Sequence, residues 1–230
     1  MVKESGGAAR SQDNKKTELW DNLSENFDGF RPQTPENNDI LKFLRDRGAL
    51  LPHFRVLDIG CAAGKYAFAF SRYCREVVAL DISPKMLARA EANKALLKQD
   101  NVTFMLADWE ELSLDQIGGP GSFDLVFANM SPGVASQPAF DKMMAASCGY
   151  CYYGGSSGRQ RLINDRIYEL LGLAASRQGG SQRFPEIFRR VWSAGFRPYL
   201  EYVNNDSKTD MTLERAISYY ESAAEAMARL

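Results

Sequence analysis

Short apolar runs alternate with amphipathic stretches through the middle of the chain. Five runs have the length and composition of buried strands: residues 56–59, 77–81, 102–106, 123–128 and 149–153. Three stretches between them carry apolar side chains at helical spacing: residues 65–73, 85–98 and 139–146. Ser83 and Pro84 precede the second stretch as helix cap and first helical residue. The alternation predicts right-handed crossovers and a doubly wound α/β fold, a mostly parallel sheet with helices on both faces.

The two ends of the chain follow a different pattern. Residues 1–16 are polar without periodicity and predict a disordered leader, whereas residues 17–50 contain two amphipathic helices that would form an N-terminal helical cap. After Gly155 strands and helices no longer alternate regularly. The elements expected there are helices at 164–175 and 185–194, a strand at 198–203 and a helix at 213–230. We expect a single domain over 17–230, in which 155–197 is a helical insertion or cap.

Composition narrows the class of protein without naming a function. The chain has 230 residues, of which 45% are hydrophobic and 25% charged, as in an ordinary globular protein with a sizeable core. Its formal net charge of −1 gives no reason to expect nucleic acid as a partner. The sequence contains no apolar run long enough to span a bilayer and no signal-peptide core. We therefore expect a cytoplasmic protein without a membrane partner.

The stretch VLDIGCAAGKYAFAF, residues 56–70, places small residues directly after the first strand of the predicted sheet. Between Gly60 and Gly64 the backbone is bare enough for a ligand to approach closely, and the following helix offers its N-terminal amides. Ligands of open parallel sheets bind at this edge. The order of the glycines departs from the dinucleotide fingerprint GxGxxG, and Asp58 would repel a pyrophosphate but attract an ammonium group. A glycine pair here also serves a simple tight turn.

Polar side chains follow the next three strands in the same way. Asp81 ends the second strand, where a carboxylate can accept both hydroxyls of a ribose. Asp108 and Trp109 follow the third strand and offer a carboxylate for an exocyclic amine and an aromatic face for a purine. Asn129 and Ser131 follow the fourth. Each could cap its strand, but together the four strand ends predict one nucleoside site.

At these residues the chain resembles the class I S-adenosylmethionine-dependent methyltransferases, which have a Rossmann-like fold. VLDIGCAAGKYAFAF is similar to their first motif, VVALDIS to their acidic ribose-binding strand end, and TFMLADWEEL to their adenine-contacting turn. FDLVFANMSP matches their fourth strand, and SPKMLARAEAN resembles the linker of the small-molecule branch, typified by quinone- and biotin-pathway enzymes. The resemblance covers about residues 39–153 and implies S-adenosyl-L-methionine as cofactor.

The resemblance also implies roles for individual residues. The loop from Gly60 to Gly64 would face the methionine part, Asp81 the ribose, and Asp108 with Trp109 the adenine. The full set of residues expected at the cofactor is Asp58, Gly60, Cys61, Ala62, Gly64, Asp81, Ile82, Met86, Asp108, Trp109 and Asn129. In similar enzymes an N-terminal helix closes over this site, which would bring Trp20 to the substrate, although an aromatic stripe at helical spacing is more often core packing.

The departures from the family bear on the acceptor. The middle glycine of the first motif is Ala62 here, and Asn-Met-Ser-Pro replaces the Asn-Pro-Pro-aromatic sequence of enzymes that methylate nucleobase or amide nitrogens. We therefore expect methyl transfer to a small molecule by in-line displacement, with Asn129 and Ser131 as candidates for positioning the acceptor and no catalytic residue identified. An RNA or protein methyltransferase and an NAD-dependent oxidoreductase are the alternatives.

Two other sets of residues have the chemistry of possible sites. Residues 155–200 hold eight arginines and three acidic residues, and Arg159 or Arg161 could orient an acidic small substrate, although a solvated helix face is the simpler interpretation. Cys148 and Cys151 have the spacing of a metal or redox pair, but a second pair of ligands is missing from the sequence. The sequence therefore predicts no metal site.

Overall fold

A computed structural model describes residues 17, 18, 20–22, 24, 33–155, 183–202, 212–214 and 217. By its contacts the chain divides into two compact units, Met1–Pro198 and Tyr199–Leu230. The sheet and its helices belong to the first unit. The predicted leader at 1–16, the predicted helix at 164–175 and most of the predicted helix at 213–230 lie outside the described residues.

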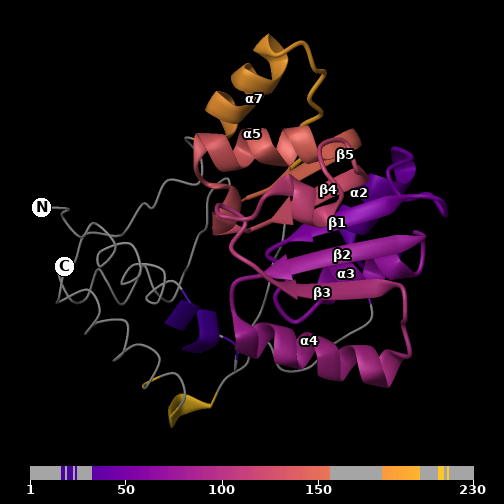
Figure 1. The fold of residues 1–230 in the computed structure, drawn as a ribbon, viewed down its shortest axis with the longest axis vertical. Coiled ribbons are helices and arrows are strands. Elements are labelled where there is room, and N and C mark those ends of the chain that lie inside the picture. The colour runs from indigo at the N-terminus through magenta and orange to yellow at the C-terminus, as the bar shows by residue number, and fades with distance from the viewer. Residues whose placement is uncertain are drawn as a thin grey trace, which may run out of the picture. The chain divides into compact units, whose positions relative to one another are not determined.

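Five parallel strands form one sheet in the order β3-β2-β1-β4-β5 (Figure 1). Their bounds are β1 Arg55–Ile59, β2 Glu76–Asp81, β3 Val102–Leu106, β4 Phe123–Asn129 and β5 Ser147–Gly154. The strand order reverses between β1 and β4, so the carboxyl ends of these two strands border the crevice in which open α/β sheets bind ligands. The predicted doubly wound fold is confirmed.

Three helices lie in the crossovers between strands: α3 Lys65–Ser71, α4 Pro84–Leu97 and α5 Gln137–Ala146. The 3₁₀ turn η2 Leu114–Ile117 lies between β3 and β4, and η3 Pro132–Val134 precedes α5. Helix α2 Asp39–Asp46 precedes β1, and α7 Arg183–Ser193 follows β5. The predicted cap of α4 is present, since the Ser83 hydroxyl accepts the N–H of Met86 at 3.1 Å. Pro84 supplies a fixed φ at the first helical position, where no N–H is needed.

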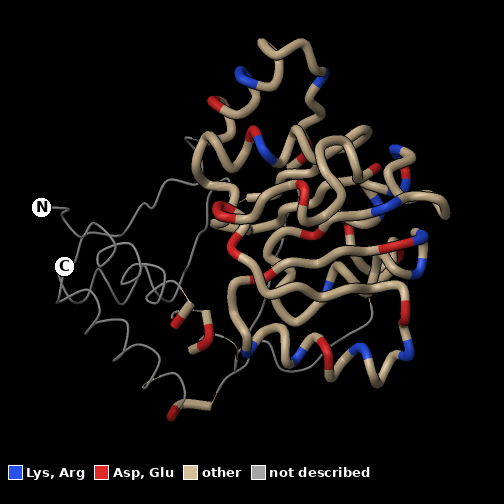
Figure 2. Tube along the Cα trace, in the orientation of Figure 1, with Lys and Arg blue, Asp and Glu red and all other residues tan. Residues whose placement is uncertain are grey.

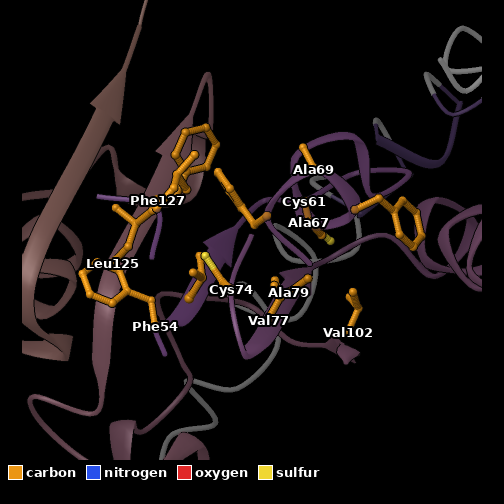
Figure 3. Close-up of a cluster of buried hydrophobic side chains, with 14 of the residues drawn as sticks. Phe54, Cys61, Ala67, Ala69, Cys74, Val77, Ala79, Val102, Leu125 and Phe127 are labelled. Carbon is orange, nitrogen blue, oxygen red and sulfur yellow. The ribbon is translucent and has the colours of Figure 1, made fainter. Parts of the chain in front are cut away.

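Two apolar clusters lie on the opposite faces of the sheet. One is packed beneath α2 and α3 and includes Phe68, Phe70 and Phe127; Figure 3 shows part of it, with Cys61 and Cys74 among the apolar side chains. The other lies beneath α5 and includes Trp109 and Met143. Burial of an aromatic or large aliphatic side chain contributes roughly 1.5–3 kcal/mol to stability. The strands are therefore held firmly, and the loops at their carboxyl ends are positioned by rigid elements.

The described residues of one predicted segment do not form the expected strand. Residues 198–202, the described part of the predicted strand 198–203, form no strand, because β-like composition alone makes no ladder and no described strand pairs with them. Basic residues outnumber acidic ones along α4, and both kinds are interspersed over the described part of the chain (Figure 2). None of the helices within the described residues is long and apolar enough to cross a membrane.

Candidate functional site

The loop after β1 has a left-handed backbone at three positions. Gly60 has a φ of 78°, Gly64 a φ of 87°, and Ala62 adopts 49° despite its side chain. The N–H groups of Gly60 and Cys61 both donate to the carbonyl of Leu80, at 2.8 and 2.9 Å. The loop is thus bonded to the end of β2, and these amides are not available to a ligand, which can approach the bare Cα positions instead.

Asp81 connects this loop to the start of α4. Its Oδ2 accepts the N–H of Ala62 at 2.8 Å, and its Oδ1 accepts the N–H of Ser83 at 2.9 Å. Burial raises the pKa of Asp81, backbone N–H bonds including these two oppose the rise, and the carboxylate of Asp21 adds to it. Asp81 therefore already holds two loops in place, and the four lone pairs of its two oxygens outnumber the three backbone N–H groups that bond to it, which leaves room for a further donor.

Asp58 is the most isolated polar group of the site. Its side chain is 2% exposed, it accepts the N–H of Ala67, and its Oδ2 has no hydrogen-bond partner. Burial, together with the nearby carboxylate of Asp81, raises the pKa of Asp58 to about 8. A buried carboxylate without a cation is costly, so this position favours a neutral acid or a bound positive charge.

This raised pKa gives a prediction for the free protein. Between pH 3.8, the ordinary pKa of the group, and about pH 8, Asp58 binds more protons in the folded protein than in the unfolded chain. Its contribution to the free energy of unfolding is therefore complete below pH 3.8 and is lost as the pH rises toward about 8. The expected loss is up to about 1.4 kcal/mol per pH unit. Asp58→Asn should remove that slope in urea unfolding measured across this range, whereas Asp115→Asn, at an exposed position, should keep it. Equal slopes in wild type and Asp58→Asn would contradict the prediction.

Gly60 and Gly64 lack a side chain for different reasons. A Cβ added to Gly60 would lie 2.5 Å from the Ser131 hydroxyl, so Gly60 is where the first loop meets the end of β4. A Cβ added to Gly64 would lie 2.5 Å from the ring of Phe68 and 3.1 Å from that of Phe104. Gly64 is therefore required by core packing, whereas Gly60 is the glycine of the pair that borders the end of β4.

The segment after β4 lies over the same edge. Asn129 pairs in register with Gly154, where an added Cβ would lie 2.1 Å from the Asn129 Oδ1. Met130 has a φ of 55° and is 56% exposed, an uncommon conformation for a residue with a side chain. Its N–H donates to the carbonyl of Gly154 at 2.8 Å, which fixes the turn. The structure thus brings the predicted positioning residues Asn129 and Ser131 to the crevice, beside Gly154 and Gly60 respectively.

The turn after β3 corrects one prediction. Trp109 is 3% exposed and lies in the core beneath α5, with its Nε1 donating to the carbonyl of Ala139 at 3.0 Å. It offers no face to a purine, because its large apolar ring is directed into the core. Asp108 is half-buried, and its Oδ1 accepts the N–H of Glu110 at 2.8 Å. Lys142, which the sequence did not single out, donates to the carbonyls of residues 109, 110 and 112 and holds this turn.

Two other predicted contacts are also buried. The side chain of Cys61 lies within the apolar cluster beneath α3, and burial raises the pKa of its thiol well above the ordinary value. Met86 is 1% exposed. Both side chains are corrected from cofactor contacts to core residues, since a position behind the loop leaves them no surface for a ligand. Ile82 is half-buried, directly after Asp81.

The N-terminal helix reaches the site through a residue that sequence reasoning missed. Asp21 accepts the hydroxyl of Ser83 at 2.5 Å and the N–H of Lys85 at 3.3 Å, at the positive end of α4. Trp20, the predicted substrate contact, directly precedes Asp21 in the sequence and is half-buried. The signal for Asp21 is weak, because an acidic residue on a short amphipathic helix is ordinary.

Of the predicted arginine-rich segment, only its last part is described. Arg159 and Arg161 lie outside the described residues. Arg190 forms an ion pair with Asp141 of α5 and lies 6.0 Å from the ring of Phe140. It also lines a pocket of about 80 Å³ between α7 and the start of α5. The described part of the chain contains no group of three or more His, Cys, Asp or Glu residues placed to hold a metal ion, and its four cysteines are free thiols.

Sheet order, glycine loop and acidic strand ends together define a class I S-adenosylmethionine-dependent methyltransferase fold. A family model described as "Methyltransferase domain" matches residues 50–171, more than half of the chain. The chain belongs to this family, whose cofactor is S-adenosyl-L-methionine, and the predicted family and cofactor are confirmed.

Curated relatives match part of the chain. Protein-L-isoaspartate O-methyltransferase 2 of Rhodopseudomonas palustris (strain HaA2) is 29% identical over 131 residues, covering 57% of this chain and 58% of that protein. Ubiquinone biosynthesis O-methyltransferase of Xanthomonas campestris pv. campestris (strain B100) is 36% identical over 103 residues, covering 44% of this chain and 41% of that protein. The chain thus matches little more than half the length of the first relative and less of the second.

A solved structure supports the fold. Magnesium protoporphyrin IX methyltransferase from Synechocystis PCC 6803, with bound SAH (S-adenosylhomocysteine), superimposes with a TM-score of 0.52 at 17% identity, covering 85% of this chain and 80% of that one. At this identity the likeness concerns the arrangement of the backbone alone.

The residues present fit S-adenosyl-L-methionine. Asp58 has a buried oxygen without a partner, and the cofactor carries an ammonium group that could satisfy it. A Cβ at Gly60 would fill the space between the first loop and Ser131. The hydrogen-bond acceptors on this edge are the carboxyl groups of Asp58, Asp81 and Asp108, which suit a ligand that donates from an ammonium group, ribose hydroxyls and an exocyclic amine.

Proposed function

We propose that the chain transfers a methyl group from S-adenosyl-L-methionine to a small-molecule acceptor by in-line displacement. The observation that carries the proposal is the buried Asp58, whose Oδ2 has no hydrogen-bond partner, beneath a left-handed glycine loop at the switch point of the sheet. When bound, the cofactor supplies an electrophilic methyl group on a sulfonium. The chain's own task is then to bind, align and exclude water, which requires no metal and no nucleophilic side chain.

Each part of the site has a proposed task. Asp58 and the backbone at Gly60 hold the methionine part, with Ala62 and Gly64 keeping the loop compact. Asp81 holds the ribose through its remaining lone pairs, with Ile82 beside it. Asp108 accepts from the exocyclic amine of adenine through its free oxygen. Asn129 and Ser131 position the acceptor, since both lie at the end of β4 where that edge adjoins the glycine loop.

A small-molecule acceptor is supported by two features. The relative that acts in ubiquinone biosynthesis shares 36% identity over the part it matches, and the turn after β4 lacks the Pro-Pro-aromatic sequence of nucleobase and amide methylation. A protein acceptor is the second candidate, because the isoaspartate enzyme matches the longer stretch of 131 residues. An RNA acceptor and an NAD-dependent oxidoreductase have less support. A cytoplasmic location and a single domain over 17–230 remain part of the proposal.

The test begins with the cofactor. Purified protein titrated with SAH should show saturable binding by calorimetry, and NADH at the same concentration should show none. Labelled S-adenosyl-L-methionine should then transfer its methyl group to members of a panel of hydroxyl-bearing aromatic acids and not to an isoaspartyl peptide. Transfer to the peptide alone would replace the small-molecule acceptor, and binding of NADH without SAH would overturn the methyltransferase itself.

Arg159 and Arg161 give a prediction on acceptor charge. If one of them orients an acidic substrate, Arg159→Ala or Arg161→Ala should raise KM for that substrate about tenfold or more, since a charge-assisted hydrogen bond contributes roughly 1.5–3 kcal/mol. The affinity for SAH should stay unchanged. Arg189→Ala, in the exposed part of α7, is the matched control and should leave KM unaltered. An unchanged KM in both test variants would remove the acidic substrate and leave the methyltransferase.

A further inference from the structure

Asp58 lacks the partner that a buried charge requires. It is 2% exposed, and its Oδ2 accepts no hydrogen bond in the structure. The titratable groups that face it are the carboxylate of Asp81 on β2, the thiol of Cys61 in the glycine loop and the phenol of Tyr66 on α3. None of these three is a cation, and no described residue forms an ion pair with Asp58.

We infer that Asp58 holds a proton in the free protein and exchanges it for the ammonium group of the ligand, which makes the site selective for ligands that carry this group. The inference rests on the proposed function and adds a proton to the binding step. It follows from geometry, because an ionised carboxylate at this depth would remain uncompensated, whereas a neutral acid costs far less. Burial and the repulsion from Asp81 raise the pKa of Asp58 to about 8, in agreement with this.

The exchange balances in atoms and charge. In the free protein, the Asp58 carboxylic acid keeps its O–H, while the N–H of Ala67 donates to the carboxyl group. As the ligand enters, the O–H bond breaks, its proton passes to the buffer, and the resulting carboxylate accepts an N–H of the ligand's ammonium group. One proton leaves for each ligand bound, and the buried pair is neutral overall. A ligand without an ammonium group does not compensate a carboxylate at Asp58, so Asp58 keeps its proton when such a ligand binds.

Two probes separate this exchange from binding in general. SAH carries the ammonium group, whereas 5′-methylthioadenosine has the same adenosine and a thioether sulfur but no amino acid. Calorimetric titration at about pH 7 in two buffers of different protonation enthalpy counts the protons released. We expect about one proton for each SAH and none for methylthioadenosine. The affinity for SAH should rise up to about tenfold per pH unit from about pH 6 to about pH 8, and that for methylthioadenosine should stay flat.

Variants assign the proton to its residue. Asp58→Asn should bind SAH more weakly, with no proton released and no pH dependence over this range. Asp124→Asn, at a carboxyl of β4 that accepts the N–H of Arg55, is the matched control and should release the proton as the wild type does. Should Asp58→Asn fail to fold, the comparison of the two ligands on the wild-type protein still decides.

The outcomes are distinguishable. SAH binding with no proton released, or a proton still released by Asp58→Asn, overturns the inference and leaves the proposed function standing. Proton release with methylthioadenosine would show that the ammonium group is not its cause and would also overturn the inference. Failure of SAH to bind in any buffer overturns the proposed function, and the inference with it.

Discussion

Gly60→Val is expected to abolish measurable binding of SAH. At a φ of 78°, a β-branched side chain is strained, and its Cβ would lie 2.5 Å from the Ser131 hydroxyl. Relief requires the loop or the end of β4 to move, and these two segments form the proposed cofactor crevice. Calorimetry with SAH on the folded variant measures the loss. The double variant Gly60→Ala/Ser131→Gly should recover part of the affinity lost in Gly60→Ala, because it removes the atoms that collide.

A control separates backbone strain from collision. Gly119 has a φ of 91° and is half-buried in the loop after η2, and a Cβ there would meet only Asp115, at 3.9 Å. Gly119→Val should therefore cost stability through strain and leave SAH binding intact. Gly64→Val should differ from both, because its Cβ would meet the rings of Phe68 and Phe104 and should destabilise the fold by several kcal/mol, roughly the sum of strain and overpacking. Normal SAH binding by Gly60→Val would reduce the loop to a tight turn.

The strands were predictable because their apolar runs have few alternatives. The run at 102–106 matches β3 in both bounds, and β1 and β2 differ from prediction by one residue at the start. A strand between two helical layers must be apolar on both faces, which gives a strong signal. The predicted strand at 198–203 had the same β-forming composition, yet its described residues form no ladder. Composition reports what fits a pleated surface and not whether a partner strand is present.

The site was predictable in position and less so in side-chain direction. Asp58, Asp81 and Asn129 lie at the ends of parallel strands, and such ends meet at one edge of a sheet. The sequence alone is therefore sufficient to predict that these three residues share that edge. The direction of Trp109 depends on the turn at 108–112, which Lys142 fixes from α5 through contacts at least 30 residues away in sequence. Asp21 meets Ser83 across 62 residues. Such long-range contacts leave no periodic trace in a single sequence.

Asp81 carries the second large effect. Two hydrogen bonds from ribose hydroxyls to a carboxylate would be worth roughly 1.5–3 kcal/mol each, so Asp81→Ala should weaken SAH binding at least tenfold, measured by calorimetry. The same substitution also affects the fold, because it leaves unpaired the N–H groups of Ala62 and Ser83, which donate to Asp81 at 2.8 and 2.9 Å. A fall in the urea midpoint of unfolding should therefore accompany the loss of binding.

Asp124→Ala tells the two effects apart. Asp124 also accepts a backbone N–H, that of Arg55 at 2.7 Å, but at the start of β4 and away from the carboxyl ends of the strands. Its removal should lower stability by a comparable amount, about 1–3 kcal/mol for an unsatisfied amide, and leave the affinity for SAH unchanged. Asp81→Ala could lose stability as Asp124→Ala does and still bind SAH with wild-type affinity. In that case Asp81 would only connect two loops, and the predicted ribose contact would be wrong. A tenfold loss confined to Asp81→Ala would instead give the carboxylate both tasks, because a group that fixes the loop geometry can still offer its remaining lone pairs to the ligand.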